Sequence, residues 1–428
     1  DEITNLVEQP EAILGSFDGR YLELPQEILT TVMRKHQRYL PVRDADGALL
    51  PMFVAVANGV VDVERVRAGN EAVLRARYED AAFFYRADRR TPLAVMRERL
   101  SRLTFTDKLG SMADRADRIA GLAHDLAPAP SPALTRAAQL VKADLGSQLV
   151  TEMTSLAGVM ARDYALHAGE TPEVAQAVYE SELPRSAGDD LPRTLPGALL
   201  SLADRLDLVA GLAATVGLPT GSSDPFAVRR AALGLLAVHR AQPALSALSL
   251  RDGLALAAAR QPVPVSEQVV TDAAEFLARR LEQVLVEEGR PVDRVRAVLV
   301  HADRPSVVDR YLAQLAALAG DPAFAAVAAM LDRARRIVPA GTPAGYDPSA
   351  LREPAELALH EVVSAFAPAD DLIGFTHAAG ALVEPVNRFF DEVFVMAGDP
   401  ALRAARLGLL AAVRDLGAGL LDWTQLRL

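Results

Sequence analysis

The sequence predicts a mainly α-helical protein with one small β-containing region at its amino-terminal end. Alanine and leucine are abundant while aromatic residues make up only 5% of the chain, a balance that favours helices over strands. Apolar residues recur at steps of three and four through most of the chain, which is typical of amphipathic helices. Only residues 1–60 carry a convincing strand pattern, two apolar runs joined by an Asp/Gly turn.

Composition limits the classes of function that the chain can have. Its 428 residues suffice for two to four domains, and the absence of cysteine excludes disulfides, thiolate metal ligands and cysteine nucleophiles. A cysteine-free chain fits a reducing compartment, so we expect a cytoplasmic protein. The net charge of −11 counts against a broadly basic nucleic-acid surface, so any RNA contact must come from local clusters of cations. No membrane-length apolar run or signal peptide is visible, and the start at Asp1 indicates a fragment or a processed product.

The first segment combines a short helix with a hairpin. The pattern predicts a helix over 25–37 and two strands on either side of the turn at 44–47. Basic residues gather where this helix meets the hairpin, and those that we consider for RNA contact are Arg34, Lys35 and Arg38. A solvated face and a contact to RNA phosphates are equally good interpretations of this cluster.

Residues 62–118 are predicted to be helical. Arg75 and Arg77 add positive charge there, but acidic residues are mixed among the cations, which weakens any basic stripe. The aromatic run at 83–85 is predicted to face the core, because helical aromatic side chains usually point inward.

The stretch from 188 to 238 reads as a loop, a long helix, a polar loop and a second helix. Apolar residues from Leu195 to Ala213 form a buried stripe, and two carboxylates three residues apart, Asp204 and Asp207, project from one edge of this helix. Asp224 before a proline predicts the cap of the second helix, whose first turn carries two arginines suited to phosphate, Arg229 and Arg230.

The remainder of the chain is predicted to be helical scaffold followed by a helical bundle. Residues 239–348 are alanine-rich and amphipathic and carry little chemistry. In the bundle at 349–428, Asp399 before a proline predicts another helix start. The phenylalanines at 389, 390 and 394 are predicted to lie in the core. The polar residues considered there for RNA contact are Asn387, Arg388, Arg403 and Arg406.

Several catalytic motifs are missing from the chain. We find no glycine-rich phosphate loop leading to Lys-Ser/Thr, no dinucleotide fingerprint, no HExxH and no serine nucleophile elbow. The sequence therefore offers no nucleotide site or hydrolytic centre of these kinds.

Three strings carry a resemblance to a known family. GDDLP (188–192), ADRLD (203–207) and DPFAVRRAALG (224–234) appear in the order found in the β subunit of the bacterial two-subunit glycyl-tRNA synthetase, and 69–84 is similar to another of its patterns. The resemblance covers essentially the whole chain, as the carboxyl-terminal portion of a longer subunit. It implies four segments: an α/β segment at 1–98, an HD-type helical domain at 99–238, a helical linker at 239–348 and a DALR-type anticodon-binding bundle at 349–428.

The resemblance also implies a degenerate metal site in the HD-type domain. The remnant comprises Asp144, Asp163, His167 and Asp204. Ala143 stands where a metal-binding histidine would be, and Asp163 stands where a second histidine is common. Such a remnant could hold a hard cation such as magnesium. We expect instead that these residues hydrogen-bond one another, fix the helix packing and bind no metal.

The resemblance implies a tRNA-recognition subunit that lacks the aminoacylation centre. Its expected partners are tRNA-Gly and an α subunit, in an α2β2 enzyme whose α subunit uses ATP and magnesium. This chain itself is expected to bind no cofactor and to contact no membrane. Two alternatives stay open: a metal-dependent HD phosphohydrolase using Asp144, His167 and Asp204, and a helical scaffold without an RNA role, favoured by the net negative charge.

Overall fold

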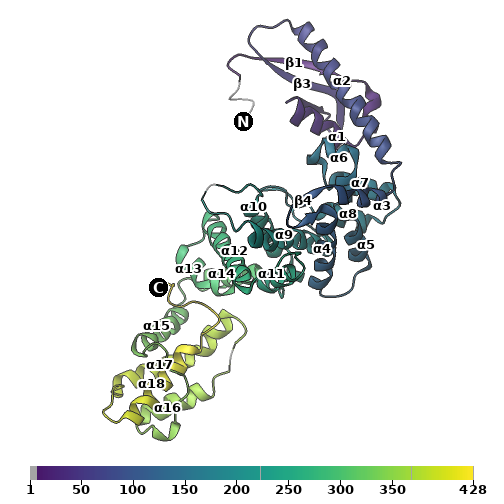
Figure 1. The fold of residues 1–428 in the computed structure, drawn as a ribbon. Helices are drawn as coiled ribbons and strands as arrows, with labels where there is room; N and C mark the ends of the chain where they lie inside the picture. Colours follow the sequence, from purple (N-terminus) through teal and green to yellow (C-terminus); the bar gives the residue numbers. More distant parts are fainter. Residues whose placement is uncertain (1–6, 222, 368, 428) are drawn as a thin grey trace. The chain divides into compact units, whose positions relative to one another are not determined.

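The structure of the chain is mainly helical, as predicted. The computed structural model describes residues 7–221, 223–367 and 369–427. Within these ranges, helices follow one another from residue 112 to residue 415, and the strands lie within the first 111 residues (Figure 1). The predicted class, mainly α with a small strand-containing amino-terminal segment, is confirmed.

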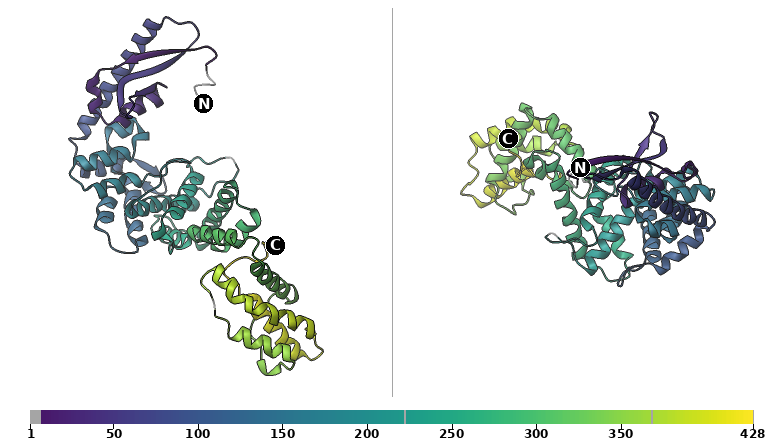
Figure 2. Two further views of the ribbon diagram at one scale, coloured as in Figure 1. Left: turned by 180° about the vertical axis from the view of Figure 1, so that it is seen from behind. Right: turned by 90° about the horizontal axis from the view of Figure 1, so that it is seen from above.

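The chain divides into two compact units. Unit 1 comprises Asp1–Gly217 and Leu256–Val265, and unit 2 comprises Leu218–Ala255 and Ser266–Leu428. Figure 2 shows the course of the chain in two further views. This division is coarser than the four expected segments, whose boundaries therefore stay predictions.

A three-stranded antiparallel sheet opens unit 1. Its strands are β1 (Pro10–Ser16), β2 (Leu40–Arg43) and β3 (Leu49–Asn58), and β3 lies in the middle. The predicted hairpin is confirmed as β2 and β3, whereas β1, which pairs with β3 along its length, was not predicted. Gly15 of β1 is required by packing, because a Cβ there would lie 2.4 Å from the ring of Phe53.

Two helices cover the buried side of this sheet. They are α1 (Gln26–Thr31), which continues as a π-helical turn at Val32–His36, and α2 (Val63–Asp88), which packs against β1. Together they match the helix predicted over 25–37 and the start of the helical stretch at 62–118. Phe53 and Tyr78 are fully buried between sheet and helix, so this small core holds the turn after α1 in place.

The rest of unit 1 is a helical body. Its elements are α3 (Leu93–Arg99), β4 (Thr104–Thr106), β5 (Gly110–Ser111), α4 (Met112–Leu126), α5 (Pro132–Leu140), α6 (Gln148–Glu152), α7 (Val159–His167), α8 (Pro172–Glu180) and α9 (Leu195–Thr215). The short ladder of β4 and β5 was not predicted. The proline-rich stretch at 127–132 separates α4 from α5.

The helix α9 is the centre of this body. It packs against α4, α5 and α8, and its predicted apolar stripe is buried, with Leu199, Leu202 and Leu206 almost fully inaccessible. Because neighbours surround α9 on several sides, its polar residues are enclosed as well, and Asp207 is 1% exposed. The two carboxylates of α9 therefore need buried cationic partners.

Unit 2 contains the remaining helices. They are α10 (Val228–Ala241), α11 (Leu250–Ala259, whose last residues belong to unit 1), α12 (Glu267–Glu287), α13 (Val292–Val298), α14 (Pro305–Ala317), α15 (Pro322–Ile337), α16 (Pro354–Ser364), α17 (Leu372–Glu392) and α18 (Pro400–Asp415). The predicted start of α18 is confirmed, because the Asp399 side chain accepts a hydrogen bond from the backbone N–H of Ala401. The core of α15 to α18 includes Phe375 and Phe389, and Trp423 packs on Phe375 with ring centroids 5.8 Å apart.

Within the described residues, no single helix is both long and apolar enough to cross a membrane. The helices α14 and α15 meet that criterion only as a pair, and this pair is bent by 113°.

Candidate functional site

The basic turn after α1 presents three cations to solvent. Val32 and Met33 are buried in the sheet core, so the following residues of the π-helical turn point outward, and Arg34 and Lys35 are exposed. Arg38 is exposed too and adopts a left-handed backbone with φ of 57°, which turns the chain into β2. A backbone hydrogen bond of 2.8 Å from Tyr39 N–H to Met33 C=O closes the turn. The structure thus brings these three predicted residues together on one rigid, exposed turn.

Arg75 and Arg77 lie on the solvent side of α2. The acidic neighbours that weakened the predicted stripe are partly engaged elsewhere: Glu71 accepts hydrogen bonds from Ser16, and Glu79 accepts one from the Tyr21 hydroxyl. The two arginines are exposed and stand at positions available to a ligand.

Phe83 on the same helix corrects a prediction. Tyr85 is buried and Phe84 packs against the core, as expected, but Phe83 is 65% exposed. The buried positions of α2 include Leu74, Tyr78 and Ala81, and Phe83 falls off that stripe. Helical spacing could therefore have identified it as a surface aromatic, a residue type on which unpaired bases stack.

The start of α10 is less suited to phosphate than the sequence indicated. The helix begins at Val228 after the N-cap residue Ala227, so the predicted cap at Asp224 is wrong. The carboxylate of Asp224 nevertheless accepts hydrogen bonds from the first backbone N–H groups of the helix, those of Val228 (2.8 Å) and Arg229 (2.9 Å). The side chain of Arg229 folds back onto the carbonyl of Gly221, while Arg230 is exposed. A carboxylate thus occupies the place where an anion would bind the helix start.

The predicted contacts of the carboxyl-terminal bundle fall into two groups. Asn387 and Arg388 are exposed on α17, and Arg403 is partly exposed on α18. Arg406, in contrast, is 6% exposed, is ion-paired with the fully buried Glu356, and donates to the Phe394 carbonyl at 2.7 Å. The structure does not support RNA contact by Arg406, which instead ties α18 to α16.

The predicted core positions of the bundle need one correction. Phe389 is fully buried and Phe390 packs against the core, but Phe394 is 75% exposed. It lies beyond the end of α17, so helical spacing no longer applied to it.

The four residues of the predicted HD remnant do not gather at one point. Asp163 accepts a hydrogen bond from the Tyr85 hydroxyl (2.9 Å), and His167 Nδ1 lies 2.7 Å from the Arg89 guanidinium. Asp144 accepts instead from the backbone N–H of Gly158 (2.7 Å). The expected hydrogen bonds among these residues are therefore replaced by bonds to other partners, although each one does link packed elements.

Asp204, the fourth residue, belongs to a buried ionic network on α9. Its carboxylate accepts from Arg115 (2.8 Å) and from the Lys142 ammonium (3.0 Å), while Asp207 is paired with Arg118 (2.7 Å). Burial would raise the pKa of Asp204, but the charges of Arg115 and Lys142 outweigh it and hold that pKa below its ordinary value. Burial, reinforced by the charge of Glu182, raises the pKa of Asp144 to about 6.

A divalent metal does not fit this arrangement. Among the described residues, no group of three or more His, Asp or Glu side chains is placed to hold a metal ion. Between Asp204 and Glu182, where a metal would need open carboxylate oxygens, the Lys142 ammonium lies 3.0 and 2.7 Å from them. The residues therefore do not provide the metal-activated water on which an HD phosphohydrolase depends.

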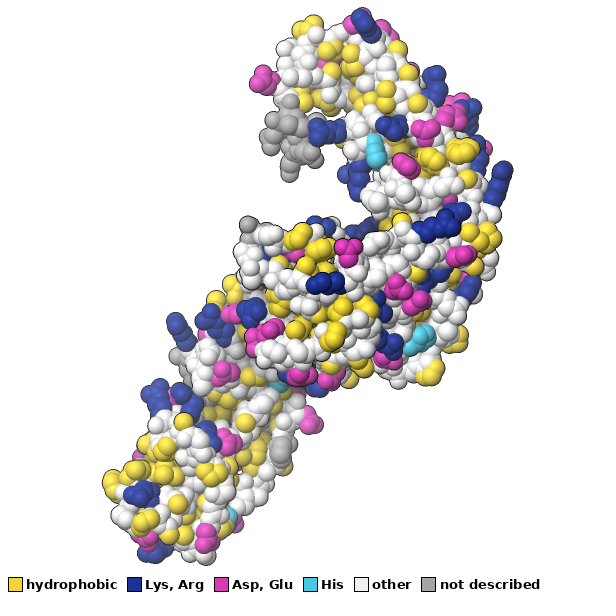
Figure 3. All heavy atoms as spheres, viewed as in Figure 1, with side chains coloured by type: hydrophobic (Ala, Val, Ile, Leu, Met, Phe, Trp, Pro, Cys, Tyr) yellow, Lys and Arg dark blue, Asp and Glu magenta, His cyan; other side chains and the backbone are white. Residues whose placement is uncertain are grey.

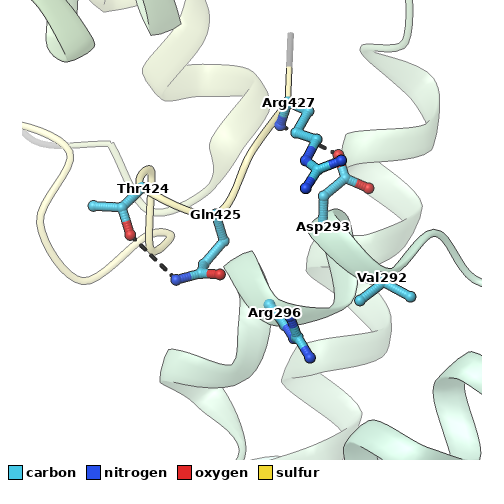
Figure 4. Close-up of a pocket in the computed structure, with 6 residues that line it drawn as sticks. All are labelled: Val292, Asp293, Arg296, Thr424, Gln425 and Arg427. Carbon is cyan, nitrogen blue, oxygen red and sulfur yellow. Dashed lines mark hydrogen bonds between the residues drawn. The ribbon is translucent and has the colours of Figure 1, made fainter.

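Each unit of the described chain contains a hollow lined by charged side chains. One, of about 620 Å³ in unit 1, is lined by hydroxyl and charged side chains that include Lys35 of the basic turn and Arg185. The other, of about 330 Å³, lies between α13 and the carboxyl-terminal tail (Figure 4), where the Arg427 backbone N–H donates to Asp293. On the face seen in Figure 3, Lys and Arg side chains are interspersed with Asp and Glu. On this face, therefore, positive charge does not form one continuous basic surface.

Comparison with known proteins decides the family. A family profile described as "Glycyl-tRNA synthetase beta subunit" matches residues 1–300. The chain belongs to the glycyl-tRNA synthetase β-subunit family.

Individual members of this family are similar over the whole chain. The glycine–tRNA ligase β subunit of Desulforamulus reducens is 40% identical over 447 residues, covering 100% of this chain and 64% of the relative. That of Moorella thermoacetica is 39% identical over 450 residues, with the same coverage. The chloroplastic/mitochondrial glycine–tRNA ligase 2 of Arabidopsis thaliana is 38% identical over 436 residues, covering 99% of this chain and 41% of the relative. This chain thus spans less than two thirds of the length of these relatives.

Proposed function

We propose that this chain is the tRNA-binding portion of a glycine–tRNA ligase β subunit. The single observation that carries the proposal is membership of that family, shown by the profile match and by relatives about 40% identical over the whole chain. The relatives' name, glycine–tRNA ligase, supplies the joining of glycine to tRNA. The proposal adds that this joining depends on ATP and that the tRNA is tRNA-Gly. In this proposal a separate α subunit performs it with ATP and magnesium in the cytoplasm, within an α2β2 enzyme.

The basic turn is the proposed first contact with the tRNA backbone. Phosphate contacts fix register and orientation without reading sequence, and exposed cations on a rigid turn suit that task. Arg34, Lys35 and Arg38 are assigned this role because the buried core beneath them fixes the turn. Arg75 and Arg77, with the exposed Phe83, form a second candidate surface on α2.

Base recognition is assigned to the carboxyl-terminal bundle. Proteins that read RNA sequence contact mostly unpaired loop bases, through hydrogen bonds and stacking on aromatic or arginine side chains. Asn387, Arg388 and Arg403 offer hydrogen-bonding groups to solvent, and the exposed ring of Phe394 offers a stacking surface. Arg230 is retained as a further phosphate contact.

Competition between tRNAs tests the proposal. A fluorescent tRNA-Gly bound to the chain is displaced with unlabelled tRNA-Gly or with a non-cognate tRNA. The proposal predicts that tRNA-Gly competes at lower concentration, and that adding the chain with its α subunit yields glycylated tRNA. Equal competition by all tRNAs would remove base recognition from the chain, and an absence of binding would favour the helical scaffold.

A further inference from the structure

Lys142 combines three features that rarely occur together. Its side chain is 6% exposed, its backbone is left-handed with φ of 63°, and it lies two residues after the end of α5, where a 3₁₀ turn begins. A left-handed backbone costs roughly 1 kcal/mol or more for a residue with a side chain, and burial of an ammonium group is costly as well. Such strain persists only where the surroundings require it.

The surroundings of the ammonium group are those of a cation site. Lys142 Nζ donates to Glu182 Oε1 at 2.7 Å and to Asp204 Oδ2 at 3.0 Å. The second oxygen of Asp204 accepts from Arg115, and the buried Asp144 lies close enough for its charge to interact with Glu182 and Lys142. Burial would lower the pKa of Lys142, yet the charges of Asp204 and Glu182 raise it, so the ammonium stays charged.

The charges of the network balance only when Lys142 is counted. Its cations are Arg115, Arg118, Lys142 and Arg205, and its carboxylates are Asp144, Glu182, Asp204 and Asp207. Removing one cation would leave a buried carboxylate uncompensated, which is strongly destabilising.

We propose that this pocket is a cation-binding site that the chain fills with its own lysine. An ammonium is a compact point charge with three donors, and it contacts the two carboxylates that a small hydrated ion would contact. Two carboxylates and several waters are the usual protein ligands of magnesium, so the same pocket, emptied of Lys142, would accept a free cation. The lysine thus holds the end of α5, the chain after α8 and α9 together without dependence on any dissolved ion.

The variant Lys142→Gly tests this proposal. Glycine removes the side chain and relieves the left-handed backbone, so a loss of stability reports the missing side chain rather than strain. Rescue of that loss by a cation then reports the missing charge. We expect the melting temperature of unit 1 to fall by roughly 5–15 °C, and ammonium or methylammonium chloride, or magnesium, to restore at least half of the loss. Tetramethylammonium chloride at the same ionic strength is the control salt, because that ion is too large and has no N–H donor.

Further variants keep the outcome decisive. Lys142→Met fills the space without charge and must show no cation-specific rescue, and Asp204→Asn combined with Lys142→Gly must lose the rescue. Lys108→Ala, at an exposed lysine, is the matched control and must respond to every salt as the unaltered chain does. If Lys142→Gly folds only when ammonium is present, the proposal is supported. An unchanged melting temperature, or equal rescue by tetramethylammonium, would overturn it.

Discussion

The buried pair of Arg406 and Glu356 offers the most quantitative prediction. Glu356 is fully buried, and its second carboxylate oxygen accepts hydrogen bonds from the backbone N–H groups of Arg352 (2.6 Å) and Glu353 (2.9 Å). The substitution Arg406→Met preserves much of the volume but leaves this carboxylate without its cation. Removing one partner of a buried ion pair costs about 3–5 kcal/mol, because a charge is left buried and unpaired.

The single tryptophan makes the effect measurable in unit 2 alone. Trp423 packs on Phe375 within the core of the bundle, so its fluorescence reports the unfolding of this region. With a denaturant slope of about 2 kcal/mol per molar urea, a loss of 3–5 kcal/mol lowers the unfolding midpoint by roughly 1.5–2.5 M. The control Arg403→Met, at a partly exposed position, should shift the midpoint by less than about 0.3 M.

A double variant separates an ion pair from simple packing. Replacing Glu356 by leucine together with Arg406→Met removes both charges, and buried pairs replaced in this way lose little stability or gain some. We therefore expect the urea midpoint of the double variant to lie close to that of the unaltered chain, so that most of the decrease caused by Arg406→Met is recovered. A shift below about 0.3 M for Arg406→Met alone would refute the assignment of this residue to the bundle core.

The other predictions concern unit 1. Asp88→Ala leaves two backbone N–H groups and a tyrosine hydroxyl without their buried acceptor, so we expect a loss of about 3 kcal/mol or more, measured as faster amide exchange in α6. Because the pKa of Asp144 is raised to about 6, its protonated form favours folding at low pH and that contribution is lost as pH rises through 6. The free energy of unfolding of Asp144→Asn, compared with that of the unaltered chain, should therefore increase by about 2–3 kcal/mol as pH rises from 4 to 7. A difference between the two chains that does not change with pH would contradict the assignment. Replacing Arg34 and Lys35 by glutamate should weaken the binding of cognate and non-cognate tRNA equally and reduce the dependence of that binding on salt concentration. Arg279→Glu should change neither the affinity nor its salt dependence.

Sequence patterns were sufficient to predict those elements of the fold that depend only on residues close together along the chain. The stripe of α9 and the aspartate–proline start of α18 are local features, and both lie where the sequence indicated. The strand β1 was missed because its pairing depends on β3, about 40 residues away. The ladder of β4 and β5 was missed because its strands are only three and two residues long, too short for an alternating pattern.

The candidate site was less predictable, because burial of a polar residue depends on distant partners. Arg403 and Arg406 look alike in sequence, and only the contact with Glu356, 50 residues earlier, separates a surface arginine from a buried one. Nothing in the sequence around Lys142 predicted its burial, because its partners Glu182 and Asp204 follow 40 and 62 residues later. The exposure of Phe83, in contrast, could have been predicted from the buried stripe of its helix.

The salt dependence of tRNA binding tests the central claim most directly. The affinity of the unaltered chain for tRNA-Gly is measured at about 50 mM and 200 mM salt. Each phosphate contact contributes about −0.9 to the slope of the logarithm of the binding constant against the logarithm of the salt concentration. With three to five phosphate contacts at the basic turn and α2, the account predicts an affinity roughly 40- to 500-fold lower at the higher salt. Absent binding at low salt, or an affinity that does not change with salt, would contradict the assignment of tRNA binding to this chain.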